Sequence, residues 1–151
     1  MQQIRVILIS QNASLTINFK KTLDVKDKQI AVLSIQYPDL RQPRRVKRIP
    51  KESLVVGDSL TVFVHCNQIR DSVHVNDMFS SNISLSMHCL DVIQLKSEQE
   101  YNVIEIQNPV YHDLNTDNLF SLNVELRDLN GELIKFTSGG YIVMKLALKH
   151  K

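Results

Sequence analysis

The chain has 151 residues, of which 43% are hydrophobic and 23% are charged, and its formal net charge is +2. These values are close to globular averages, so they exclude wholesale disorder, a collagen-like chain and a long charged coiled coil. The length fits one domain, which we expect to cover residues 1–151. No apolar run approaches the roughly 20 residues that cross a bilayer, so we expect no membrane span.

Strand-like alternation of apolar and polar residues dominates the sequence. In chain order it predicts strands at residues 4–9, 15–19, 30–37, 60–66, 83–95, 101–106, 120–127 and 141–148, with a candidate short strand at 73–75. Residues 55–59 are typical of a turn. The turn sequence at residues 128–131 predicts a hairpin whose second strand begins near residues 133–136.

Eight or nine short strands without a crossover helix exclude a parallel sheet and favour an antiparallel sandwich or barrel. An immunoglobulin-like sandwich would ordinarily carry a tryptophan between two cysteines, and this chain has no tryptophan. A jelly roll accommodates eight strands with long connections at one end. We therefore expect an all-β fold, a single jelly-roll antiparallel β-sandwich of about eight strands.

Residues 38–52 form the most strongly charged connection, and they contain three of the four prolines. We expect an extended surface loop there. Residues 41–51 of this loop contain no acid and six cations, which are Arg41, Arg44, Arg45, Lys47, Arg48 and Lys51. Such a loop could bind phosphates through counterion release, pair with acidic neighbours in an assembly, or remain solvated. No aromatic residue interleaves the cations, so stacking on single-stranded bases is not supported.

The sequence offers no set of residues for catalysis, a metal or a cofactor. The histidines lack metal-ligand spacing, and adjacent strand residues such as His65 and Cys66 point to opposite faces. There is no serine or cysteine in a nucleophile elbow and no glycine-rich phosphate loop. We therefore expect a protein that is not an enzyme and has no cofactor. The two cysteines, Cys66 and Cys89, are expected to be free thiols that face the core.

Two blocks of motifs point to a family. The first is an Asn-Ala-Ser turn at residues 12–14, followed by the strand Ile-Ala-Val-Leu-Ser-Ile-Gln-Tyr-Pro at residues 30–38. The second, at residues 108–140, is Asn-Pro-Val-Tyr-His, an alternating strand, an Asn-Gly turn and Phe-Thr-Ser-Gly-Gly. This order resembles the penton, or minor capsid, proteins of Maverick/Polinton-type and adintovirus-like DNA viruses, and more distantly virophage pentons. Residues 73–79 depart from the family pattern.

The resemblance implies a structural capsid protein of the virion, a homopentamer at icosahedral five-fold positions among trimers of a double jelly-roll major capsid protein. The basic loop would then meet encapsidated DNA or an acidic face of that protein. Assembly inside the host cell, in nucleus or cytoplasm, is implied, and the amino terminus lacks a secretory signal. The aromatic residues expected at subunit contacts, each of which could equally be core, are Tyr37, Phe79, Tyr111 and Phe136.

Two other classes of function compete with this interpretation. One is a jelly-roll module that binds protein or carbohydrate, which includes a viral protein domesticated by its host. Sugar sites commonly present exposed aromatic side chains, whereas aromatic residues make up only 6% of this chain. The other class is an enzyme on a cupin-like barrel, which needs clustered His and Glu ligands that the spacing does not provide.

Overall fold

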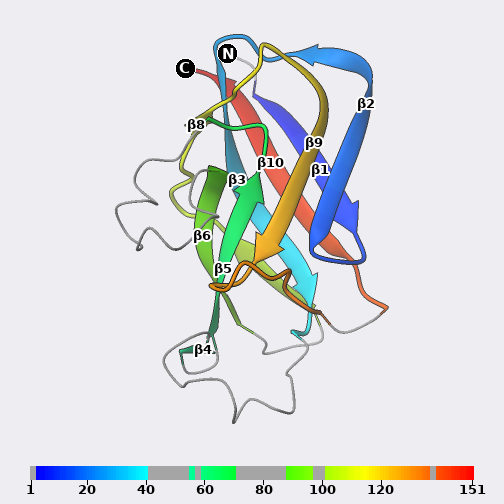
Figure 1. Ribbon diagram of the computed structural model, residues 1–151, viewed down its shortest axis with the longest axis vertical. Coiled ribbons are helices and arrows are strands. Elements are labelled where there is room, and N and C mark those ends of the chain that lie inside the picture. Colours follow the sequence, from blue (N-terminus) through cyan, green and yellow to red (C-terminus); the bar gives the residue numbers. More distant parts are fainter. Residues whose placement is uncertain (1–2, 41–54, 57–58, 71–87, 97–100, 137–138) are drawn as a thin grey trace.

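The computed structural model is a sandwich of two antiparallel β-sheets (Figure 1). It describes residues 3–40, 55–56, 59–70, 88–96, 101–136 and 139–151. Across these ranges there is no α-helix. Accordingly, no helix in the described ranges is long and apolar enough to cross a membrane.

The first sheet is built from both ends of the sequence. Its strands, in order across the sheet, are β1 (Ile4–Ser10), β10 (Ile142–His150), β3 (Lys28–Pro38) and β7 (Tyr101–Glu105). The two-residue strand β8 (His112–Asp113) pairs with the start of β3. All of these pairings are antiparallel. The last strand of the chain therefore lies inside the sheet, between the first strand and the third.

The second sheet packs on the first and uses the remaining strands. It consists of β2 (Ser14–Asp24), β9 (Asn118–Arg127) and β5 (Ser59–Cys66), and β6 (Cys89–Lys96) pairs along β5. The short strand β4 (Val55–Val56) pairs with the start of β5. Here too every pairing is antiparallel.

Apart from the two-residue strands β4 and β8, the strands pair in a nested order. The first pairs with the last, so β1 meets β10, and then β2 meets β9, β3 meets β7 and β5 meets β6. A long antiparallel ribbon that folds back on itself and rolls up produces this order, which is the topology of a jelly roll. The predicted fold class is therefore confirmed.

Apolar side chains fill the space between the sheets. They come from alternate positions of each strand, such as Val6 and Leu8 on β1 and Leu122, Val124 and Leu126 on β9, all of which are buried. Burying a side chain of this kind contributes about 1.5–3 kcal/mol. The alternation that identified the strands in the sequence is thus the alternation between this core and the outer faces.

Three predicted elements differ from the structure. The hairpin expected after residues 128–131 has no second strand, because Leu133 pairs only with Arg127 and Phe136 only with Leu40, each through an isolated bridge. Arg127 ends β9 in the second sheet, whereas Leu40 follows β3 in the first. Residues 133–136 therefore cross between the sheets and form a strand in neither.

The second difference is β2, which runs past residue 19 to Asp24. Its pairing with β9 is interrupted between Asn18 and Leu23 and resumes at Leu23 and Asp24. Val55 and Val56, expected in a turn, form β4 instead. The strand expected at residues 83–95 is described from Cys89 onward. The candidate strand at residues 73–75 lies outside the described residues.

Candidate functional site

Tyr37, predicted as a subunit contact, lies near the end of β3 and is 1% exposed. Its hydroxyl donates to the backbone carbonyl of Lys96 at 2.6 Å and accepts from the Lys96 N–H at 3.0 Å. Lys96 ends β6 in the second sheet. One buried phenol therefore joins the two sheets, and its side chain belongs to the interior of this chain's own sandwich.

Phe136 packs beside Tyr37, with ring centroids 6.0 Å apart and ring planes inclined by 54°. It is partly buried against the core. Close by, the chain passes Pro38 so tightly that a Cβ atom at Gly140 would lie 2.6 Å from the Pro38 Cβ, so only glycine fits there without a shift of the backbone. These contacts hold the chain at Leu40, immediately before the basic run of the sequence begins.

Tyr111 lies at the opposite end of the first sheet from Tyr37. Its hydroxyl accepts a hydrogen bond from Gln3 Nε2 at 3.2 Å, and Lys149 Nζ lies 3.9 Å from its ring centroid, a cation–π contact. Lys149 follows the core residue Leu148 on β10. Its side chain and the Tyr111 ring therefore lie on the outer side of the sheet, where Tyr111 stays a candidate contact.

The structure thus brings Tyr37 and Phe136 together and places Tyr111 apart from them. The fourth aromatic candidate, Phe79, lies outside the described residues. The same holds for the six cations of the basic loop, which are Arg41, Arg44, Arg45, Lys47, Arg48 and Lys51.

A surface that the sequence did not single out is the outer face of the first sheet. The strand registers place Ile9 beside Val143, Val143 beside Gln36 and Gln36 beside Val103, so that one row crosses all four long strands. We call these four residues the outer row. Ile9 is 59% exposed and Val103 is 61% exposed. Outward positions of a solvent-facing antiparallel sheet are usually polar, so two exposed aliphatic side chains in one row are unusual.

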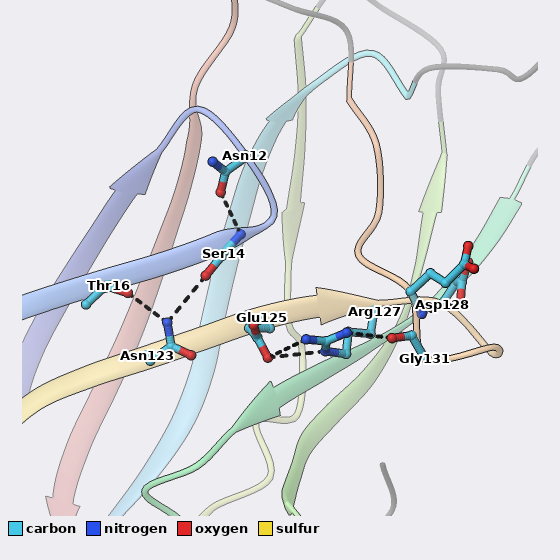
Figure 2. A network of polar contacts seen from close by, with 9 residues as sticks. Asn12, Ser14, Thr16, Asn123, Glu125, Arg127, Asp128 and Gly131 are labelled. Carbon is cyan, nitrogen blue, oxygen red and sulfur yellow. Dashed lines mark hydrogen bonds and ion pairs between the residues drawn. The ribbon is translucent and has the colours of Figure 1, made fainter. Parts of the chain in front are cut away.

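The outer face of the second sheet carries a polar network over β2 and β9 (Figure 2). The Asn123 amide reaches from β9 to the hydroxyls of Ser14 and Thr16 on β2, at 3.4 and 2.7 Å. Two nitrogens of the Arg127 guanidinium donate to one Glu125 oxygen, at 3.2 and 2.9 Å. The third nitrogen donates to the carbonyl of Gly131 at 2.5 Å, which fastens the turn after β9 to this face.

His65 lies beside this network on β5, in register with Glu125 on one neighbouring strand and Cys89 on the other. Its Nδ1 is buried without a hydrogen-bond partner, and its ring meets the ring of His88 edge-on at 6.0 Å. Burial lowers the pKa of His65 from the ordinary value of 6.5. The Glu125 carboxylate opposes that effect, and His88 adds to it.

The two cysteines belong to different apolar clusters. Cys66 lies in the main core, whereas Cys89 packs with Phe63 in a small second cluster that Val92 and Leu129 cover. Both are free thiols. Burial raises the pKa of Cys66 to about 11 and that of Cys89 to about 12, so neither is a thiolate at neutral pH. Within the described part of the chain, no three His, Cys, Asp or Glu side chains are grouped to hold a metal ion.

Among solved structures, the crystal structure of the selenomethionine-labelled mavirus penton protein is similar to this chain, with a TM-score of 0.62. The similarity covers 98% of this chain and 99% of that one, at 10% sequence identity. The chain has the fold of a penton protein. No protein-family model matches the sequence, and no curated protein matches it. The likeness therefore lies in the fold.

The link between the sheets at Tyr37 predicts a specific loss of stability. In Tyr37→Phe the part-buried N–H and C=O of Lys96 lose the hydroxyl of the buried Tyr37 as their partner, so we expect the free energy of unfolding to fall by about 1–3 kcal/mol, measured by urea denaturation. Tyr101→Phe is the matched control: its hydroxyl makes the same pair of bonds to the backbone of Tyr141, at 2.5 and 3.1 Å, but the residue is 39% exposed. Water can replace those bonds. Equal losses in both variants would contradict the assignment.

The buried His65 predicts a pH dependence of stability. Folding lowers the pKa of His65, so below pH 6.5 the unfolded chain binds a proton at this residue more readily than the folded chain does. The contribution of neutral His65 to stability is therefore fully present above pH 6.5 and is lost as the pH falls from there toward the folded pKa. Urea midpoints at about pH 7.5 and pH 5.5 should therefore differ less in His65→Gln than in the wild type. His150→Gln, at an exposed position, should keep the wild-type difference. An unchanged difference in His65→Gln would exclude this role.

Proposed function

We propose that this chain is a penton protein, the structural protein at the five-fold vertices of an icosahedral capsid. The observation that carries the proposal is the nested jelly-roll pairing, which matches the mavirus penton protein over almost the full length of both chains. The sequence motifs at residues 12–38 and 108–140 support the same family independently of the structure. The location that follows is the virion.

In this proposal the whole chain is one jelly-roll domain, and five copies form a ring among trimers of a double jelly-roll major capsid protein. A closed ring is built from heterologous contacts, so each copy needs two different lateral surfaces. Two unlike surfaces meet this requirement. The outer face of the first sheet carries exposed aliphatic side chains, and the turn after β9, which Arg127 fastens through the Gly131 carbonyl, carries acidic ones.

The proposed role is structural and not enzymatic. Support comes from the environments of the cysteines and of Arg127, residue types that often serve as nucleophiles or anion-binding groups in enzymes. The raised pKa values leave Cys66 and Cys89 protonated and therefore poor nucleophiles. Arg127 is held by Glu125 and by the turn carbonyl of Gly131. These contacts stabilise the fold.

The mass of the purified chain in solution tests the proposed function. At physiological salt we expect a species of five copies, measured by native mass spectrometry and by sedimentation velocity. A chain that stays monomeric at the highest attainable concentration would contradict the penton assignment. That result would favour a jelly-roll binding module, which needs no ring.

We also propose that the basic loop contacts the genome or an acidic face of the surrounding capsid protein. Reversal of its charge in Arg44→Glu, Arg45→Glu and Arg48→Glu should reduce incorporation into capsids at physiological salt, because each lost cation removes a counterion-release contribution. The matched control is the same triple substitution with Gln, which removes charge without reversing it and should have a smaller effect. Full incorporation of the Glu variant would mean that the loop is only solvated.

A further inference from the structure

The outer face of the first sheet concentrates exposed apolar surface. Over the described ranges there are eight exposed large hydrophobic residues, and five of them lie on this face or at its edge: Ile7, Ile9, Tyr101, Val103 and Tyr141. They come from strands far apart in the sequence, and the registers of β1, β10, β3 and β7 bring them together. Exposed apolar side chains gathered on one sheet face in this way are typical of an interaction site.

The charged residues of the same face are mostly cationic. Next to the outer row, the registers align Ile7, Lys145, Ser34 and Glu105 across the sheet. Further along β1 and β10 the outward side chains include Arg5 and Lys149. Beside Lys149 the same side of the sheet also carries Asp113 on β8, which accepts from Gln29 and pairs with Lys151 Nζ at 3.1 Å. The face therefore carries four cations and two carboxylates. A surface that covers it should combine an apolar contact with negative charge.

The turn after β9 has that combination. Residues 128–134 contain Asp128 and Glu132 and no cation, and Leu133 is among the exposed hydrophobic residues. Asp128 Oδ1 accepts from the backbone N–H groups of Asn130 and Glu132, at 2.8 and 3.0 Å, which fixes the shape of the turn. The Glu132 side chain is exposed.

We propose that the outer face of the first sheet docks against the turn at residues 128–133 of a second copy of this chain. This inference rests on the proposed homopentamer and names the two surfaces that join its subunits. The face belongs to the first sheet, whereas the turn extends from β9 of the second and is fastened to it by Arg127. Contact between them runs head to tail, which is the geometry that closes a ring.

The test measures the concentration of half-assembly of the full-length chain by sedimentation velocity over a dilution series. Ile9→Glu and Val103→Glu should each raise it on the order of tenfold or more, because each places a charge in the covered apolar contact. Both positions are exposed in the isolated chain, so folding should be retained, and thermal melting checks this. Phe120→Glu is the matched control, since Phe120 is 72% exposed but lies on β9 of the other sheet. It should leave assembly unchanged.

A charge exchange tests the identity of the partner surface. Lys145→Glu should weaken assembly on the order of tenfold, and Glu132→Lys in the same chain should restore it, because every interface of a ring built from the double variant carries both reversed charges. If Lys145 had only a structural role within its own sheet, a substitution in the turn after β9 would not be expected to restore assembly.

The failures are distinguishable. If the wild type forms no five-copy species, the proposed function and this inference both fail. If the ring forms and Ile9→Glu and Val103→Glu leave it intact, this inference alone is overturned. If these two variants keep the ring but are no longer incorporated into capsids, the outer face of the first sheet contacts another capsid protein instead of a second copy. Weakening by Lys145→Glu without rescue by Glu132→Lys would exclude the turn as the partner surface.

Discussion

The pairing of the last strand with the first and third strands is the constraint on which the rest of the structure depends. Strand β10 lies between β1 and β3, so the first sheet is continuous only when the end of the chain has joined it. The side chains that β10 turns inward, Ile142, Met144, Leu146 and Leu148, are all fully buried. Because these strands are distant in sequence, the chain loses loop-closure entropy before the contacts between them form. Such non-local pairing is typical of slow-folding β proteins.

This nested pairing divides the molecule into a shared interior and two unlike exteriors. The interior is closed at one end by Tyr37, whose hydroxyl bonds to the backbone of the opposite sheet. The polar exterior ties the turn after β9 in place through Arg127, and the apolar exterior presents the outer row. A protein whose role is to meet copies of itself in a closed ring needs this kind of asymmetry between faces.

Much of the fold could be predicted from the sequence, because a half-buried strand shows its two faces as an alternation of apolar and polar residues. Strands β1, β3, β5, β9 and β10 lie within a few residues of their predicted positions. The alternation fails at residues 133–136, where an apolar pattern typical of a strand belongs to a segment that crosses between the sheets. Which sheet a segment joins depends on distant partners and is not contained in its own pattern.

The candidate surfaces were harder to predict for the same reason. Alternation indicates that Ile9 and Val103 point outward, but only the register of four strands shows that they share one row. The run Val-Ile-Leu-Ile at residues 6–9 does indicate a covered outer face, because a strand that is apolar on both faces usually packs against other atoms on both. Tyr37 shows the converse limit: a tyrosine suits an interface or a core equally well when its hydroxyl finds a partner.

A three-dimensional reconstruction of the purified assembly by electron cryomicroscopy is the most direct test of the central claim that this sandwich builds a vertex through unlike faces. The account predicts a five-fold ring in which β10 lies between β1 and β3 in every copy and the outer row is covered by the neighbouring subunit. A different strand order, or a ring that leaves the outer row open to solvent, would contradict it.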